Sequence, residues 1–385
     1  MIPFVVSLSN HDRNQRAHTF PKARISQHSH AGLPSPYAKG AIMQRLLRKL
    51  LPAALLALAA VPQVPAAAVP PPARLLSRLA LGGPGGWDYL AFDAPSRHLF
   101  VSRGDRVLVI DVDAGKQIGT IANTAGVHGI AFADDLHRGF VSDGRSASVT
   151  VFDLASLKTV ATITGTGQNP DAILYDGASH HVLTFNGRNA SASVIDPAKQ
   201  AVIGSIALPG KPEFAVADGA GHVYVNIEDK SELVQLDSLH GKVLQVWSLA
   251  PCASPTGLAL DNAHHRLFAV CDNRTMAVLD AVDGHHVADV PIGDGPDGVV
   301  FDPAEAMIYS ANGESGTITA VHEDDPDHYR VTATVPTQAS ARTLALDPKL
   351  HRLYLSAARL GATRQANGRR TIEPDSFAVL TVGRP

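Results

Sequence analysis

Seven residues, most of them ionisable, recur at intervals of 40, 43, 42, 43, 41 and 45 positions along this chain. Among them are four carboxylates, one imidazole and one guanidinium. Carboxylates held close together raise one another's pKa unless a cation neutralises them, so such a set suits a divalent metal or a cationic ligand. The imidazole and the guanidinium would serve to move a proton or to orient an anionic group. The residues are Asp88, His128, Asp171, Glu213, Thr256, Asp297 and Arg342.

Each of these residues stands before a short apolar segment that usually ends in Asp, such as Leu90–Asp93. A unit of roughly 42 residues thus recurs seven times, and each unit of such a repeat buries its faces only against its neighbours. Asn-, Asp- and Gly-rich turns divide each unit into four short strands. The chain is therefore predicted to be all-β, a seven-bladed β-propeller of four-stranded antiparallel blades. In the fifth unit the expected strands are Gly257–Asp261, Arg266–Val270, Met276–Asp280 and Val287–Pro291.

The seventh unit lacks a fourth strand, because its third strand, Phe377–Val382, is followed only by Gly383, Arg384 and Pro385. The segment at about 74–81, before the first unit, has the length and apolar content of the missing strand. We therefore predict that this N-terminal strand completes the last blade and closes the ring, which removes the open sheet edges.

Several strands resemble those of a known family. Phe100-Val-Ser, Phe140-Val-Ser and Tyr309-Ser-Ala-Asn312, with following strands such as Val107–Asp111, are similar to the YVTN-repeat (YncE-like) seven-bladed propellers. The resemblance covers about residues 74–385. It implies the propeller fold, but this family and its relatives include binding proteins, structural surface proteins and enzymes, so it implies no particular activity.

In a propeller the inner strand of every blade begins at one face of the ring, beside the central channel. We therefore expect the seven recurring residues to meet at the channel mouth as ligand-binding groups, with Trp87 beside them and His128 and Arg342 as catalytic candidates. The loops after the second strands open on the same face. They add Asn186 and Asn226 as neutral oxygen ligands, so the metal candidates are Asp88, Asp171, Glu213, Asp297, Asn186 and Asn226. The other interpretation is a polar, water-filled funnel without a ligand.

Other polar residues are expected to be structural. Eight histidines fall in turns between first and second strands, on the opposite face, and a repeated turn position explains them better than metal binding. The acidic run 323–328 is expected to be a solvated turn on that face. The long loop 358–376 emerges beside the mouth and is either a basic cover for it or an insertion. The histidines are His98, His137, His180, His181, His222, His264, His265 and His351.

The N-terminal region resembles an export signal. Arg45, Arg48 and Lys49 precede an apolar stretch and the small residues 66–68, as in a secretory signal peptide. We expect 1–42 to be an upstream or disordered extension, 43–68 a signal peptide and 69–385 the propeller, with no membrane span in the mature chain. The protein is then periplasmic or secreted, where Cys252 and Cys271 either pair or remain as two packed thiols.

Composition and the absence of several motifs reduce the number of functions to consider. A net charge of −3 gives no overall basic field for nucleic acid, and haem, zinc-protease, nucleophile-elbow and phosphate-loop motifs are absent from the sequence. We therefore expect an exported binding or scaffold protein with an unidentified small molecule or protein on the mouth face. The cofactor is unidentified, a divalent cation such as calcium being the candidate. The alternatives are a metal-dependent hydrolase of the lactonase (gluconolactonase-like) type, with His128 as general base, and single-stranded DNA binding.

Overall fold

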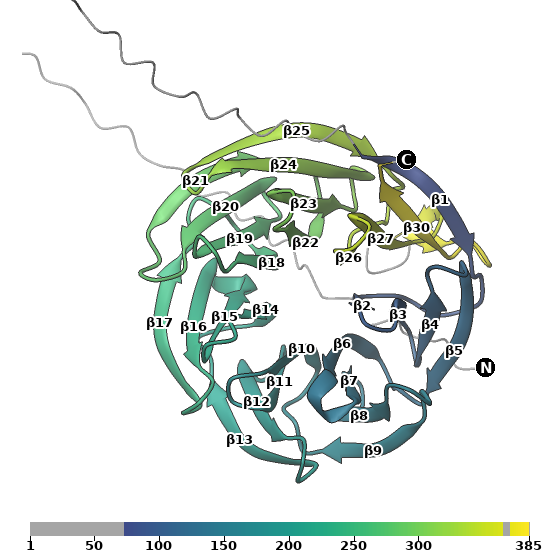
Figure 1. Ribbon diagram of the computed structural model, residues 1–385, viewed down its shortest axis with the longest axis vertical. Helices are drawn as coiled ribbons and strands as arrows, with labels where there is room; N and C mark the ends of the chain where they lie inside the picture. The colour runs from purple at the N-terminus through teal and green to yellow at the C-terminus, as the bar shows by residue number, and fades with distance from the viewer. Residues whose placement is uncertain (1–72, 365–369, 385) are drawn as a thin grey trace, which may run out of the picture. The chain divides into compact units, whose positions relative to one another are not determined.

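The computed structural model describes residues 73–364 and 370–384. Within them, seven antiparallel sheets of four strands each are arranged in a ring (Figure 1). The predicted all-β, seven-bladed propeller is therefore confirmed. The proposed extension (1–42) and signal peptide (43–68) lie outside the described residues. No helix in the described part of the chain is long and apolar enough to cross a membrane.

The strands of each blade run from the channel outward in sequence order, except in the last blade. Blade 1 contains β2 (Leu90–Asp93), β3 (His98–Arg103), β4 (Arg106–Asp111) and β5 (Lys116–Ala122). Blade 2 contains β6 (Val127–Ala133), β7 (Arg138–Asp143), β8 (Ser148–Asp153) and β9 (Thr159–Thr164), and blade 3 contains β10 (Pro170–Asp176), β11 (His181–Asn186), β12 (Ser191–Asp196) and β13 (Ala201–Ala207). Blade 4 contains β14 (Pro212–Ala217), β15 (His222–Ile227), β16 (Glu232–Asp237) and β17 (Lys242–Ser248).

Blade 5 contains β18 (Pro255–Asp261), β19 (Arg266–Cys271), β20 (Thr275–Asp280) and β21 (His286–Pro291). Blade 6 contains β22 (Pro296–Asp302), β23 (Met307–Asn312), β24 (Thr317–Asp325) and β25 (His328–Pro336). Two 3₁₀ turns occur in the connections, η1 (Asp134–Leu136) and η2 (Glu228–Lys230). Each strand predicted for the fifth unit lies within two residues of its observed bounds, because the turn residues mark where each strand ends.

Blade 7 closes the ring with both ends of the described chain. Its strands are β26 (Leu344–Asp347), β27 (Arg352–Ala357), β30 (Ala378–Gly383) and β1 (Arg74–Ala80), in that order from the channel outward. β1 pairs antiparallel with β30 from Arg74 opposite Gly383 to Ala80 opposite Ala378. The predicted N-terminal closing strand is thus confirmed.

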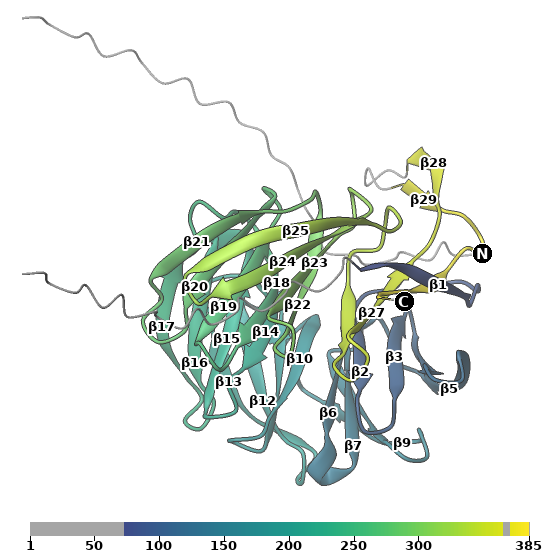
Figure 2. The ribbon, with the colours of Figure 1, turned by 45° about the horizontal axis from the view of Figure 1, so that its top comes forward.

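The predicted long loop of blade 7 contains a two-stranded sheet, β28 (Leu360–Arg364) and β29 (Arg370–Ile372). This hairpin stands away from the blade 7 sheet (Figure 2). An ion pair of 2.6 Å joins Nε of Arg359 to Oε2 of Glu373 at its base. Part of the basic charge expected on this segment is therefore neutralised within it.

The hydrophobic core lies between blades. Seven clusters of buried apolar side chains occur in the described residues, and each spans two neighbouring blades. The middle strands are buried on both faces, as in β19 and β23, because a neighbouring blade covers each face. Outer strands such as β5 are mostly exposed. Packing of this kind holds the start of every inner strand at a fixed place around the channel.

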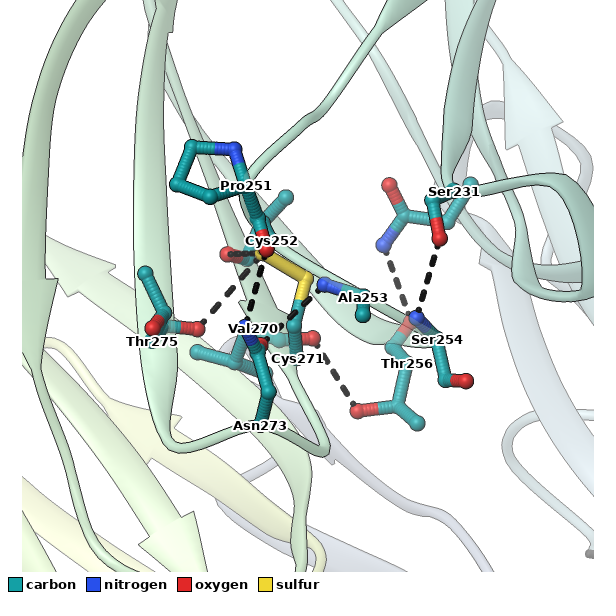
Figure 3. Close-up of a disulfide and its surroundings, with 12 residues drawn as sticks. Ser231, Pro251, Cys252, Ala253, Ser254, Thr256, Val270, Cys271, Asn273 and Thr275 are labelled. Atoms are coloured by element: carbon teal, nitrogen blue, oxygen red, sulfur yellow. Dashed lines mark hydrogen bonds between the residues drawn. A yellow bond between two sulfur atoms is a disulfide. The ribbon is translucent and has the colours of Figure 1, made fainter. Parts of the chain in front are cut away.

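A disulfide joins Cys252, before β18, to Cys271 at the end of β19, with a Cα–Cα distance of 5.6 Å (Figure 3). Asn273 supports the same loop, since its Nδ2 donates to the carbonyl of Pro251 at 2.9 Å and its Oδ1 accepts from the amide of Ala253 at 3.1 Å. The sequence left open whether these two cysteines pair or remain as thiols. They pair, and the disulfide links the segment that leads into blade 5 to the second strand of that blade.

Turns on the opposite face carry contacts between blades. Arg97 reaches back from blade 1 to Asp347 of blade 7 at 2.7 Å, and His351 reaches from blade 7 to Asp302 of blade 6 at 2.8 Å. Both residues have positive φ, of 62° and 50°, at the same turn position. At these two turns the Asp that ends an inner strand thus anchors the next blade, and His351 has the structural role expected of it.

Candidate functional site at the channel mouth

One buried arginine holds the segment that leads into blade 1. Arg103 is 1% exposed, and its guanidinium donates to backbone carbonyls throughout the glycine-rich segment 82–86. Three glycines there have φ between 60° and 110°, which glycine adopts without strain, so the segment can curve around the guanidinium. Burial lowers the pKa of Arg103 to about 10. Trp87, Asp88 and Tyr89 follow directly and are placed by this arrangement.

His128 bridges two carboxylates at the mouth. Its Nδ1 lies 2.5 Å from Oδ2 of Asp88 and 3.6 Å from Oδ1 of Asp171. Burial alone would lower the pKa of His128, but the charges of Asp171 and Asp88 raise it to about 9, so the imidazole is charged at neutral pH. Gly144 lies against the ring, where a Cβ would approach Nε2 to 2.7 Å. His128 is therefore confined between the carboxylates and the loop of its own blade.

Arg342 connects three blades. Its Nε donates to Oδ2 of Asp297, and its Nη2 donates to Oδ1 of Asp88 at 3.2 Å and to the carbonyl of Trp87 at 3.3 Å. Burial would raise the pKa of Asp88, but His128 and Arg342 together hold it below its ordinary value. The pKa of Asp297 stays raised, because burial outweighs the charge of Arg342. One guanidinium thus shields two of the four carboxylates.

Lys211 is a third cation at the mouth, and sequence reasoning missed it. Its Nζ lies 3.1 Å from Oε2 of Glu213 and also pairs with Oε2 of Glu228. Glu213 is 4% exposed, and burial together with the charge of Asp171 raises its pKa well above the ordinary value. Lys211 stands two positions before Glu213 across a proline, and this Lys-Pro-Glu sequence is the signal that could have identified it.

Tyr89 occupies the centre of this ring of acids. Burial raises the pKa of its hydroxyl, and the charges of Asp171, Glu213, Asp88 and Asp297 raise it further. Its ring lies 5.3 Å from that of Phe214, across the channel in blade 4. Within the described residues the hydroxyl of Tyr89 makes no hydrogen bond, so it remains available to a ligand. Sequence reasoning missed Tyr89, which lies between Asp88 and the expected strand Leu90–Asp93.

A cavity of about 480 Å³ lies among the inner strands, and Tyr89 and Phe214 belong to its lining. Residues of β2, β14, β18, β22 and β26 form most of the remaining lining, and none of the four ring acids belongs to it. Tyr89 therefore borders both this cavity and the ring of acids.

Four other predicted residues have side chains that are buried in the blades and do not open on the mouth. Three of them, Thr256, Asn226 and Trp87, lie at contacts between blades, and Asn186 lies within one blade. The hydroxyl of Thr256 donates to the carbonyl of Pro296 in blade 6 at 2.8 Å. Asn226 donates through Nδ2 to the carbonyls of Thr256 and Gly257, both at 3.0 Å, whereas its buried Oδ1 has no hydrogen-bond partner among the described residues. Trp87 is 6% exposed and packs against Phe377 at 5.6 Å. Thr256 and Asn226 thus join neighbouring blades, and Trp87 belongs to the core.

Asn186 is held inside blade 3. It donates through Nδ2 to the hydroxyls of Ser191 and Ser193 at 3.2 and 3.0 Å, and its Oδ1 accepts from Thr184 at 3.2 Å. Asn312 makes equivalent contacts in blade 6. Asp143 takes the same position in blade 2, where burial raises its pKa to about 7. The side chain at the end of the second strand thus forms hydrogen bonds that link the second and third strands of the same blade.

The mouth therefore brings together Asp88, Asp171, Glu213 and Asp297 with His128, Lys211 and Arg342. Four ring carboxylates face three cations, and one of these cations also neutralises Glu228. Burial raises the pKa of Asp171 to about 6, so it is largely ionised at neutral pH. Chemically, this arrangement can accept one further positive charge or several hydrogen-bond donors.

The comparisons with known proteins support the fold alone. No family model matches the sequence, and no curated protein matches it. Among solved structures, "Crystal structure of RRP9 WD40 repeats" is 12% identical with a TM-score of 0.68, covering 81% of this chain and 97% of that one. "Structure of U3-55K" is 12% identical with a TM-score of 0.67, covering 80% and 98%. The "Kuenenia stuttgartiensis Hydrazine Synthase" chain is 16% identical with a TM-score of 0.63, covering 70% and 92%. These values show a shared β-propeller architecture, and the YVTN-type assignment stays a prediction.

Proposed function

We propose that this protein is a binding protein whose channel mouth receives the cationic group of a ligand. The observation that carries the proposal is the excess of buried carboxylates over cations around the Tyr89 hydroxyl. The rigid ring of blades holds these groups at fixed distances, so little conformational entropy is lost when a ligand binds.

Asp171 is the primary anchor in this proposal. It is 4% exposed, and its nearest cationic atom is Nδ1 of His128 at 3.6 Å. Within residues 73–364 and 370–384, no donor hydrogen-bonds to its carboxylate. A ligand ammonium group would supply the missing donors and would gain a charge-assisted hydrogen bond in a site with little water. The free hydroxyl of Tyr89 would accept or donate beside it.

The second candidate function is a metal-dependent hydrolase of the lactonase type. It is favoured by one group of ligand atoms, from Asp88, His128 and Asp171, which lie within 4.8 Å of one another. Against it, Asn186 uses both ends of its amide within blade 3, and Arg342 occupies the space between Asp88 and Asp297. The cationic-ligand proposal needs no rearrangement of these groups.

Export and a YVTN-like relationship belong to the same proposal. The signal-like segment 43–68 and the Cys252–Cys271 disulfide favour a periplasmic or secreted protein. A positively charged ligand or protein group outside the cytoplasm is then the expected partner. Single-stranded DNA is disfavoured as a partner, because Trp87 is buried and the mouth is acidic.

The proposal is tested by calorimetric titration of the purified protein with spermidine, whose ammonium groups model a cationic ligand. We expect saturable binding that weakens at least tenfold in Asp171→Asn. Asp196→Asn is the matched control, because Asp196 pairs with Lys199 on the outer surface of blade 3 at 2.6 Å. Equal binding by wild type and Asp171→Asn would contradict the proposal.

Melting with calcium or with EDTA separates the two candidates. The hydrolase candidate gains if calcium raises the melting temperature, Asp171→Asn abolishes that rise, and the protein opens a lactone. Absence of any calcium effect together with spermidine binding leaves the binding function.

A further inference from the structure

A second cluster of ionisable groups lies on the opposite face, at the junction of blades 5 and 6. Asp261 ends β18, His264 stands in the following turn, and Glu323 comes from β24 of the next blade. Nδ1 of His264 lies 2.6 Å from Oδ2 of Asp261 and 3.5 Å from Oε1 of Glu323. Three ligand atoms from two blades thus lie within 4.8 Å of one another.

Both carboxylates of this cluster are buried. Asp261 is 2% exposed and Glu323 is 3% exposed, so the expectation that the run 323–328 is solvated is wrong for its first residue. The reason is that β24 is longer than the third strands of other blades and carries Glu323 under the turn of blade 5. Within the described residues, Oε2 of Glu323 has no hydrogen-bond donor.

The neighbouring arginine does not neutralise this pair. Arg266 directs Nη1 to Asp280 at 2.5 Å, Nη2 to Asp327 at 3.1 Å and Nε to the carbonyl of Pro326 at 2.8 Å. His264 is therefore the one basic side chain that the described residues place beside the two carboxylates. Two buried carboxylates facing one imidazole lack compensating charge, and burial of uncompensated charge is costly.

Three similar clusters occur in the described residues, and each has a different explanation. The mouth cluster contains Arg342, and the Asp302 cluster contains Arg384, which pairs with Glu305. The third cluster, around Asp283 and His285, is solvent-exposed, and Asp280 in it pairs with Arg266. The Asp261 cluster alone among these four combines burial with a missing cation.

We propose that Asp261, His264 and Glu323 bind a divalent transition metal of the zinc type. Zinc binds both imidazole nitrogen and carboxylate oxygen, whereas calcium takes oxygen ligands only. Ligand atoms of a tetrahedral zinc lie about 3.3 Å apart, given metal–ligand bonds of about 2.0–2.1 Å. The spacing of 3.5 Å between His264 Nδ1 and Glu323 Oε1 fits this geometry, and the contact of 2.6 Å between His264 Nδ1 and Asp261 Oδ2 would lengthen when a metal replaces the proton between them.

Such a metal would join blade 5 to blade 6. His264 is 48% exposed in its side chain, so the ion can enter from solvent and keep a water molecule as its fourth ligand. Asp261, His264 and Glu323 do not belong to the channel mouth, which lies on the other face. The metal proposal is therefore independent of the function proposed for the mouth.

The test is a titration of the metal-free protein with zinc chloride, followed by cobalt(II) as a spectroscopic probe. We expect one zinc ion per chain to be lost in His264→Ala and in Glu323→Gln, together with the absorption bands of four-coordinate cobalt. His264 is half exposed, so its variant retains the fold even if Glu323→Gln does not.

His240→Ala is the matched control. His240 forms the same contact with Asp237 three residues earlier, at 2.7 Å, but no buried carboxylate from another blade faces it. Its zinc stoichiometry should equal that of wild type. An unchanged stoichiometry in His264→Ala, or the same loss in His240→Ala, would overturn the proposal.

Discussion

The channel mouth and the junction of blades 5 and 6 both bury carboxylates, but they balance them differently. At the mouth, Arg342 and His128 stand between acids that come from separate blades, and Lys211 stands between two acids of blade 4. At the junction, Asp261 and Glu323 share only the half-exposed imidazole of His264. The mouth therefore has cations built into the chain, whereas the junction depends on a proton or an ion from solution.

This difference shows that a carboxylate cluster in a propeller cannot be interpreted from its acids alone. The cations that accompany it decide whether it is a finished ion-pair network or a site for an external charge. At the mouth the balance is nearly complete, with Asp171 as the least compensated member. At the junction two carboxylates face one imidazole, so a larger fraction of the carboxylates lacks a cationic partner than at the mouth.

The largest effect should come from removing a cation at the mouth. Arg342→Met leaves Asp88 and Asp297 facing each other in a buried site, so we expect a loss of about 3 kcal/mol in the free energy of unfolding. Urea denaturation measures it. Arg138→Met, which breaks the exposed pair with Asp153, should cost less than about 1 kcal/mol. Equal losses in the two variants would remove the distinction between a buried network and surface pairs.

A smaller effect should appear in the pH dependence of His128. Its folded pKa of about 9 exceeds the ordinary value of 6.5, so its contribution is fully present below pH 6.5 and is lost as the pH rises through 9. We expect this group to account for a fall of about 2–3 kcal/mol in unfolding free energy over that range, absent in His128→Gln. The exposed His285 gives the control variant, His285→Gln, which should retain the fall. A His128→Gln profile parallel to wild type would show that the mouth does not hold a charged imidazole.

The smallest effect should have the opposite sign and lie at the junction. Burial and the charge of Asp261 raise the pKa of Glu323 to about 7, so its favourable contribution is present below about pH 4.5 and is lost as the pH rises through 7. In EDTA at pH 8, Glu323→Gln should therefore be more stable than wild type by about 1–2 kcal/mol, and equal to it near pH 4. Thermal unfolding at the two pH values checks this. Destabilisation at pH 8 would mean that the junction is already balanced without metal.

The fold could be predicted from the sequence because its signal is repeated. Each inner strand is a similar short apolar segment that usually ends in Asp. The fourth strand missing from the seventh unit indicated that the segment near residue 74 supplies it. The convergence of Asp88, Asp171, Glu213 and Asp297 followed from the same periodicity, since equivalent positions in a ring of blades must lie around one axis.

The parts of the site that were missed depend on side-chain contacts that periodicity does not encode. Lys211 and Tyr89 lie one or two residues from the aligned position. Lys211 matters because it pairs with Glu213 and Glu228 of blade 4, and Tyr89 because it faces Phe214 across the channel. Glu323 looked like part of a solvated charged run because the extra length of β24 is visible only when its pairing with β25 is known. Asn186 was a reasonable oxygen ligand by type, yet two serines in its own blade use its amide.

The closing of blade 7 by β1 and β30 also determines how the ring responds to tension. Arg74 and Gly383, the outer ends of the two strands, lie opposite each other, so a pull on both ends of the chain would load a single pair of hydrogen-bonded residues first. The hydrogen-bonded pairs between β1 and β30 would then break one after another. They would not share the load, as they do when strands are pulled parallel to each other in opposite directions. We therefore expect a pull on both ends of the chain to open the ring first at the seam between β1 and β30.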